Sequence, residues 1–400
     1  MGVLITDGNE RAALAVTRAL GQKQIDVLVG SETERSLAGS SRYCRRSFRY
    51  PSPYEDPKGH IDALLQVVMR QKIEMLVPIS DLAMQLIGER RVEFDAHTRI
   101  AAPAPAVYET VSDKYRLMKL AQQLDVPIPD TLFVEEGRVP QDLRSMGEFP
   151  LIVKPGRSRM LIDGAWTNTS VRQVMNREEL EQVYRQTRYL KWPSLIQRRI
   201  EGEGQGIFAL CDHGRPVALF GHRRLREKPP AGGVSVLRES IELPKLMADH
   251  AVRLLQHVGW HGVAMVEFKV ERRTRIPRLM EINGRFWGSL QLAVDADLNL
   301  PFMLYQLTCG RPVETPPAGY RVGVKSRWLL GDLDHLLARL FKSTDALRLP
   351  PGYPSRVRCA LEFVRFFQKD LHYEVERWND AGPARHEWCA YVKAMVKGHA

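Results

Sequence analysis

Cysteine and long apolar runs are the scarcest features of this sequence. No stretch approaches about 20 uninterrupted apolar residues, so we expect no membrane-spanning helix. The cysteines are widely spaced and form no C-x-x-C pair, which favours reduced thiols over a disulfide framework or a zinc site. They are Cys44, Cys211, Cys309, Cys359 and Cys389.

The N-terminus lacks the features of a targeting signal. Met1–Gly8 reads as a buried strand and has no basic start, no apolar signal core and no small-residue cleavage site. A myristoylation signal is a poor match, because Gly2 is followed by strand residues and Asp7 instead of a serine at the required place. Together with the reduced thiols, these absences predict a cytoplasmic protein.

The composition is that of an ordinary globular chain with an excess of basic residues. The 400 residues are 44% hydrophobic and 26% charged, which is ample for two or three domains with proper cores. The formal net charge of +11 implies an anionic substrate, and it leaves contact with acidic lipid head groups or a polyanion open.

The most informative feature is a group of polar residues on two short apolar strands. In Met280–Asn283, alternation along an extended strand places Glu281 and Asn283 on one side while Ile282 points into the core. Glu267 lies in a second apolar strand pattern and is the candidate for a facing carboxylate. Mg²⁺ prefers such oxygens and keeps water and phosphate oxygens as further ligands. The pattern predicts a magnesium and phosphate site; the alternative is a pair of edge-strand acids that face water.

Arg285 continues the same alternation, and its planar guanidinium would reach over the phosphates. With the upstream Val266–Phe268, the run Glu281–Ser289 resembles the metal-binding end of the ATP-grasp superfamily, especially its carbamoyl-phosphate-synthase-like and carboxylate-amine ligase branch. The resemblance covers roughly residues 1–310. It implies an α/β fold with ATP and Mg²⁺ as cofactors and Mn²⁺ as an alternative metal. It also implies that the metal ligands are Glu267, Glu281 and Asn283.

Two lysines match the phosphate-binding lysines of that superfamily. Lys114 opens a helical pattern, although a lysine in a first helical turn is more often solvated. Lys154 ends the apolar strand Phe149–Pro155. The family's Gly- and Ser-rich hairpin, which folds over the phosphates with backbone N–H groups, should follow, but Gly156–Ala165 holds only two glycines and two arginines. The arginines would replace backbone donors, or the segment would be a disordered flap until nucleotide binds.

The adenine-binding hinge is expected in Trp192–Glu203, an apolar strand that leads into polar residues. Many relatives carry a carboxylate where this chain has Arg198. Glu203 is the first candidate for the ribose-binding acid, and Glu201 is the second. The G-x-G-x-G run Gly202–Gly206 is followed by a β-hairpin pattern and no helix, so it does not predict a dinucleotide fingerprint. The resemblance thus assigns the nucleotide contacts to Gln197, Arg198, Ile200 and Glu203.

A basic run occupies much of Gly221–Ser240. Such runs are most often solvated faces or nucleic-acid patches. In the resembling branch this strand and loop face the acyl phosphate and the second substrate, so we assign the run to a substrate lobe and expect no nucleic acid. Arg223 and Arg238 are the candidate contacts for a carboxylate or an acyl phosphate.

The strand pattern Glu74–Ile79 ends in a polar tip. Tips at the carboxyl ends of parallel strands bind ligands in α/β sheets, so Ser80 and Asp81 are candidates for substrate contact. A helix cap, with Asp81 before Leu82–Met84, is an equally good interpretation.

The expected organisation is three consecutive domains. Residues 1–110 show strand, helix and strand patterns and resemble a Rossmann-like pre-ATP-grasp domain. Residues 111–310 would form the ATP-grasp catalytic domain. Residues 311–400 would form a mostly helical C-terminal extension of unknown role, with helical periodicity in Trp328–Phe341 and Arg356–Leu371.

These residues predict an ATP-dependent ligase that forms a carbon-nitrogen bond. A small carboxylate would attack the γ-phosphate of Mg-ATP, and a small amine would displace phosphate from the acyl phosphate. Two Mg²⁺ ions, Lys114, Lys154 and Arg285 would offset the charge repulsion, while Arg223 and Arg238 contact the substrate. A homo-oligomer stays open. The alternatives are a bicarbonate-activating enzyme that forms carboxyphosphate and a nucleotide-responsive binding protein without turnover; a dehydrogenase is distant, because no glycine fingerprint is present.

Overall fold

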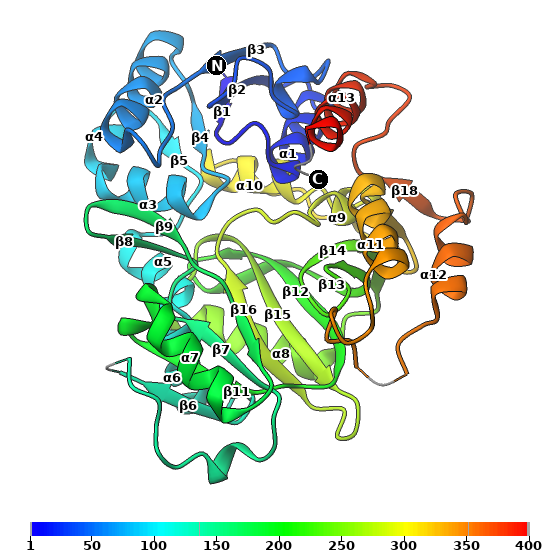
Figure 1. The fold of residues 1–400 in the computed structure, drawn as a ribbon. Helices are drawn as coiled ribbons and strands as arrows, with labels where there is room; N and C mark the ends of the chain where they lie inside the picture. Colours follow the sequence, from blue (N-terminus) through cyan, green and yellow to red (C-terminus); the bar gives the residue numbers. More distant parts are fainter. Residues whose placement is uncertain (1, 136, 351, 398–400) are drawn as a thin grey trace. The chain divides into compact units, whose positions relative to one another are not determined.

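The computed structural model describes residues 2–135, 137–350 and 352–397 (Figure 1). These residues divide into two units that interleave along the chain. The terminal unit takes its described residues from Met1–Ala102, Phe220–Leu243 and Arg285–Ala400, and the central unit from Pro103–Leu219 and Pro244–Gly284. This division differs from three consecutive segments, and the three-domain organisation stays a prediction.

The N-terminal part of the terminal unit is a parallel sheet in the order β3-β2-β1-β4-β5. Its first strand is completely buried at Val3, Leu4 and Ile5, as expected for a parallel strand in an α/β fold. The predicted strand-helix-strand opening is confirmed. The elements are β1 (Gly2–Ile5), α1 (Arg11–Gly21), β2 (Asp26–Ser31), η1 (Ala38–Ser40), β3 (Arg46–Arg49), α2 (Pro57–Gln71), β4 (Met75–Val77), α3 (Asp81–Glu89), α4 (Arg91–Asp95) and β5 (Arg99–Ile100).

The rest of the terminal unit combines helices with the strands β14, β17 and β18. The helix predicted over Arg356–Leu371 is shorter than expected and ends at Phe363. Leu371, the last residue of the predicted helix, instead begins β18, whose backbone pairs with β17. The elements are β14 (Val234–Ile241), α9 (Gln291–Asp295), α10 (Leu300–Thr308), β17 (Lys325–Arg327), α11 (Leu329–Phe341), α12 (Arg356–Phe363), β18 (Leu371–Tyr373) and α13 (Gly382–Val396). Across the described part of the chain, no helix has the length and apolar character needed to cross a membrane.

The central unit contains an antiparallel sheet in the order β10-β7-β11-β6. Apolar side chains of this sheet, including Val153 and Ile196, form a core with Leu180 and Tyr184 of α7. The elements of this region are α5 (Pro105–Ser112), α6 (Lys114–Gln123), β6 (Thr131–Val134), η2 (Arg144–Met146), β7 (Leu151–Pro155), β8 (Arg159–Ile162), β9 (Ala165–Asn168), β10 (Arg172–Val174), α7 (Arg177–Gln186), η3 (Arg188–Lys191) and β11 (Ser194–Arg198).

A second group of antiparallel strands, β12 (Gly202–Asp212), β15 (Gly262–Glu271) and β16 (Pro277–Asn283), completes the central unit together with α8 (Lys245–His257). The glycines at the start of β12 lie in the ladder with β15, which confirms that they form no dinucleotide turn. His213 and Gly214 connect β12 to β13 (Arg215–Lys228) through a turn in which both residues have positive φ. The predicted hairpin is therefore confirmed.

Candidate nucleotide and metal site

Two carboxylates oppose each other on β15 and β16. The ladder pairs Glu267 directly with Glu281, and the side-chain amide of Asn283 lies 3.3 Å from an oxygen of each. Glu267 is buried, so the alternative of two strand acids that both face water does not describe it. Like charges directly opposite one another destabilise a sheet unless a cation lies between them.

The chemistry of this donor set fits Mg²⁺, which takes carboxylate and amide oxygens and completes its shell with water and phosphate. As drawn, Nδ2 of Asn283 donates to both carboxylates. A half-turn of the amide plane would present Oδ1 instead, which is the atom that a cation would contact. The geometry thus brings together the three predicted ligands, and their role as metal ligands stays a prediction.

Lys114 lies beside these carboxylates. Its Nζ is 3.3 Å from Oε2 of Glu281 and donates to Oγ of Ser158 at 3.0 Å. Asp113 caps the helix that Lys114 opens, and the backbone N–H of Lys114 donates to the carbonyl of Gly156 at 2.6 Å. The lysine is buried, so it is not the solvated first-turn lysine of the alternative interpretation.

Lys154 is the second cation of this group. It is buried at the end of β7, and its Nζ lies 4.0 Å from Sδ of Met280, the residue before Glu281. The pKa of Lys154 is lowered to about 8, chiefly by burial; Glu281 opposes the shift, and the nearby Lys114 and Lys269 add to it. An ammonium held in this environment gains more from an incoming polyanion than a solvated one does.

The segment after Lys154 forms a β-hairpin. Its strands β8 and β9 are joined by Asp163 and Gly164, both with positive φ, which is the pattern of a type I′ turn. Near its base, Nε of Arg157 lies 3.4 Å from Oδ2 of Asp113, and Oγ1 of Thr169 donates to the carbonyl of Arg157 at 2.6 Å. One of the two arginines predicted to replace phosphate donors therefore contacts an acid of the chain.

The predicted hinge is β11 and the residues after it. Gln197 is buried and donates to Oγ1 of Thr131 at 3.0 Å, Ile200 is buried, and Glu203 and the second-choice Glu201 are exposed. These placements leave the adenine and ribose assignments untested.

Arg198, which stands where relatives often have an acid, is held by two acids of this chain. Its Nε lies 2.7 Å from Oδ2 of Asp130, and its Nη2 lies 3.1 Å from Oε1 of Glu271. A hydrogen bond from Thr274, together with Arg198 and Arg278, lowers the pKa of Glu271 to about 2. The pairing gives Arg198 a structural partner beside its predicted nucleotide role.

Lys269 is a cation that the sequence interpretation missed. It lies two residues after Glu267 on β15, its Nζ donates to the carbonyl of Ile200 at 3.3 Å, and its charge acts on Lys154. The same alternation that selected Glu281 and Asn283 would have selected it.

The predicted catalytic arginines of the terminal unit contact acids of that unit. Arg285 forms a two-point pair with Asp81, at 2.8 and 2.9 Å. A helix does begin here, but its cap is Ser80 and not Asp81, which is its first residue. Arg223 lies 2.6 Å from Glu239. The completely buried Arg238 pairs with Glu374.

The basic run on β13 is therefore not a solvated face. Arg224 pairs with Glu227 at 2.9 Å, Arg226 pairs with Asp332 at 2.6 Å, and Lys228 pairs with Asp334.

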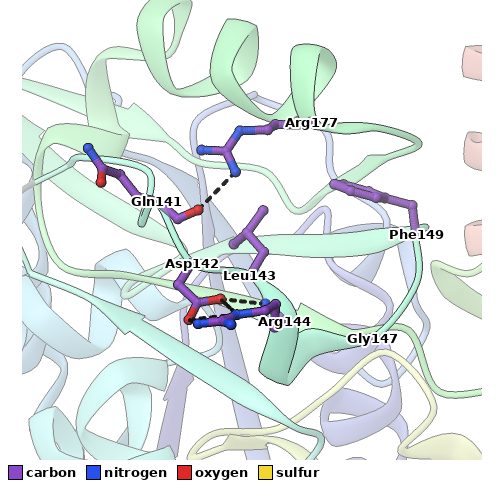
Figure 2. A pocket seen from close by; sticks show the side chains of 7 residues that line it. All are labelled: Gln141, Asp142, Leu143, Arg144, Gly147, Phe149 and Arg177. Atoms are coloured by element: carbon purple, nitrogen blue, oxygen red, sulfur yellow. Dashed lines mark hydrogen bonds and ion pairs between the residues drawn. The ribbon is translucent and has the colours of Figure 1, made fainter.

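A pocket of about 570 Å³ lies elsewhere in the central unit, around η2 and α7 (Figure 2). Figure 2 shows Asp142 against Arg144 and Arg177 pointing to the main chain of Gln141; the distances are 2.7 and 3.0 Å. The lining residues are Gln141, Asp142, Leu143, Arg144, Gly147, Phe149 and Arg177. They include none of the predicted site residues, so this pocket does not mark the nucleotide site.

The chain is similar to known proteins in part of its sequence and in its fold. Residues 192–328 match the family model described as an ATP-grasp in the biosynthetic pathway with Ter operon. The curated D-aspartate ligase of Enterococcus faecium (strain Aus0004) is 20% identical over 323 residues, which cover 77% of this chain and 75% of that protein.

Solved structures share the fold. The L-amino acid ligase from Bacillus licheniformis aligns with a TM-score of 0.61 and 15% identity, over 77% of this chain and 74% of that one. The biotin carboxylase domain of Hydrogenobacter thermophilus 2-oxoglutarate carboxylase, in complex with MgADP, ADP and bicarbonate, aligns with a TM-score of 0.60 and 13% identity, over 81% and 73%. The chain is therefore similar to ATP-grasp proteins in the sequence of residues 192–328, to a ligase over most of its length, and to ATP-grasp ligases in its fold.

Proposed function

We propose that this chain is an ATP- and Mg²⁺-dependent ligase that joins a small carboxylate to an amine through an acyl phosphate. The observation that carries the proposal is the opposed pair of Glu267 and Glu281, with Asn283 between them and Lys114 and Lys154 beside them. A cation would relieve the repulsion between the carboxylates, and an anion would stabilise the buried ammonium groups. A polyphosphate with its divalent cation supplies both.

In the proposed reaction a carboxylate oxygen attacks the γ-phosphorus of ATP, the bond from that phosphorus to the β–γ bridging oxygen breaks, and ADP leaves. The amine nitrogen then attacks the acyl carbon, phosphate leaves with the electrons of the carbon-oxygen bond, and the nitrogen loses a proton. Bound Mg²⁺ would neutralise phosphate charge, held by Glu267, Glu281 and Asn283. Lys114 and Lys154 reduce the repulsion between the two approaching anions, because fixed charges act strongly in a buried site.

The arginines have a proposed place in this scheme. A guanidinium fork fits a transferring phosphoryl group or a carboxylate, and we assign Arg285, Arg223 and Arg238 to these contacts. Arg238 would exchange its present partner Glu374 for the substrate carboxylate.

We propose that the reaction takes place in the cytoplasm, as the sequence predicts.

We also propose that an amino acid is one of the substrates. The support for this substrate is that two similar proteins are named D-aspartate ligase and L-amino acid ligase. An amino acid offers both a carboxylate and an amine, and the net charge of +11 favours an anionic partner substrate.

The test is ADP release from Mg-ATP with pooled amino acids, with and without hydroxylamine to trap an acyl phosphate as a hydroxamate. Glu281→Gln should abolish both products, while Glu178→Gln, which changes an exposed acid of α7, should retain them. Bicarbonate-dependent ADP release without hydroxamate would favour the bicarbonate-activating alternative, which the bicarbonate complex of the carboxylase domain supports. ATP binding without ADP release under all these conditions would indicate a binding protein.

A further inference from the structure

Two histidines and an aspartate meet at the turn after β12, within the central unit. Asp212 ends β12, His213 begins the turn, and His261 precedes β15. Cys211 pairs with Gly262 in the ladder, which brings the two segments together. The imidazole rings stack with centroids 4.4 Å apart at 28°, and a ligand atom of each of the three residues lies within 4.8 Å of the others.

The cluster is held in place by bonds that are independent of any ligand. The backbone N–H of Gly214 donates to the carbonyl of Trp260 at 2.7 Å, which ties the turn to the residue before His261. Arg215 lies 3.2 Å from Oδ2 of Asp212 and so orients the carboxylate. The other oxygen, Oδ1, lies 3.4 Å from Nδ1 of His261 and 4.0 Å from Nε2 of His213. A guanidinium bound to Oδ2, the oxygen that does not contact the histidines, is the kind of support that orients ligands in metal sites.

We propose that Asp212, His213 and His261 form a site for a divalent transition metal such as Zn²⁺, Co²⁺ or Ni²⁺, separate from the predicted magnesium site. Ligands about 2.1 Å from a tetrahedral ion lie about 3.4 Å from one another. The His261 pair already has this spacing, and the side chain of His213, 80% exposed, has room to move inward. Imidazole ligands favour these metals over Mg²⁺, and water would complete the shell on the exposed side.

The test is a titration of the full chain with Co²⁺, followed by visible absorption, and with Zn²⁺, followed by calorimetry. We expect one ion per chain and a loss of affinity of at least about tenfold in His213→Ala and in His261→Ala. Two variants should leave the affinity unchanged: His257→Ala, which removes an exposed histidine of α8, and Glu281→Gln, which alters the magnesium site.

Unchanged Co²⁺ affinity in His213→Ala would overturn the proposal, as would an equal loss in His257→Ala. Loss of Co²⁺ binding in Glu281→Gln would place the ion at the other site and would also overturn it. Because the metal titration needs no ATP turnover, its outcome does not depend on the ligase proposal.

An independent observation concerns α12 in the terminal unit. Cys359 is buried, whereas Val357, Leu361 and Val364 are exposed at spacings of four and three residues, which places them on one helical face. Phe367, shortly after the helix, is completely exposed. Exposed basic residues accompany this face; they are Arg356, Arg358, Arg365 and Lys369.

We propose that this face binds the surface of an anionic membrane. An apolar face flanked by Lys and Arg inserts its apolar side chains at the level of the head groups, while the cations contact anionic lipids. The excess of positive charge along the whole chain favours the same partner. A lipid surface therefore matches both the apolar side chains and the charge of this face.

The test is flotation of the full chain with vesicles of phosphatidylcholine alone and of equimolar phosphatidylcholine and phosphatidylglycerol. Binding should require the anionic lipid, fall at least about tenfold in Leu361→Glu, and fall about fivefold in Arg365→Gln. Val92→Glu, at an exposed apolar residue of α4, should bind as the wild type does. Absence of binding to anionic vesicles would overturn the proposal. It would also be overturned if the wild type formed a dimer and bound no vesicles, and if Leu361→Glu dissociated that dimer.

Discussion

Replacing Lys154 by methionine should weaken nucleotide binding and at the same time stabilise the folded protein. Methionine has a similar length and no charge, so it keeps most of the packing at the end of β7. It removes an ammonium group that the fold buries, and it removes the proposed phosphate contact.

The magnitude follows from the pKa of Lys154. Burial is the largest cause that lowers this pKa from 10.5 to about 8. Since a tenfold change in a proton equilibrium is about 1.4 kcal/mol, keeping the ammonium costs the folded state about 3 kcal/mol at neutral pH. Between pH 8 and 10.5 the unfolded chain binds more protons than the folded chain, so the stability of the wild type rises with pH in this window. The advantage of the variant should therefore disappear above pH 10.5.

The assay is urea unfolding followed by circular dichroism at neutral pH and above pH 10.5, with titration of a non-hydrolysable ATP analogue at neutral pH. Lys58→Met, at an exposed lysine of α2, is the matched control and should change the free energy of unfolding by less than about 0.5 kcal/mol. A variant at Lys154 that is less stable than the wild type at neutral pH, or whose advantage persists at high pH, would refute the reasoning. Unchanged affinity for the analogue would remove Lys154 from the nucleotide site.

Three further predictions concern the same unit. Asn283→Ala should lower ATP turnover by more than about 10²-fold with little change in unfolding, because it removes a preorganised polar group and not core volume; near-normal steady-state ADP release would reject the metal site. Amide exchange in residues 156–169 should slow when Mg-ATP binds, and unchanged protection would mean that this hairpin has no nucleotide role. Arg198→Ala should lower the free energy of unfolding above pH 4.5 and reduce the amount lost on acidification, because Arg198 helps to lower the pKa of Glu271, and the stability from that lowered pKa is lost as pH falls toward about 2. An acid-unfolding curve identical to that of the wild type would contradict this role of Arg198.

Local sequence patterns were sufficient to predict features that depend on a single strand or turn. The alternation of β16 put Glu281 and Asn283 on one side, because side chains of a strand change faces at every residue. The hairpin at His213 and Gly214 followed from turn residues between two apolar runs. The hairpin expected after Lys154 from the family resemblance is present as β8 and β9, which are joined at Asp163 and Gly164.

Contacts between segments that are distant along the chain could not be predicted from the sequence. The pairing of Glu267 with Glu281 depends on the register of β15 and β16, which includes an irregularity just after Glu267. The partners of Arg285 and Arg238, which are Asp81 and Glu374, lie far from them along the chain.

The sequence by itself determined the residue types of the predicted site, since strand alternation and turn chemistry are local properties, and its resemblance to a known family determined the fold class. Only the tertiary structure decided which charges meet. Lys154 acquires its low pKa from burial and from Lys114 and Lys269, residues of other elements. The physical reason is that desolvation and Coulomb energy depend on distances in space, which no local pattern specifies.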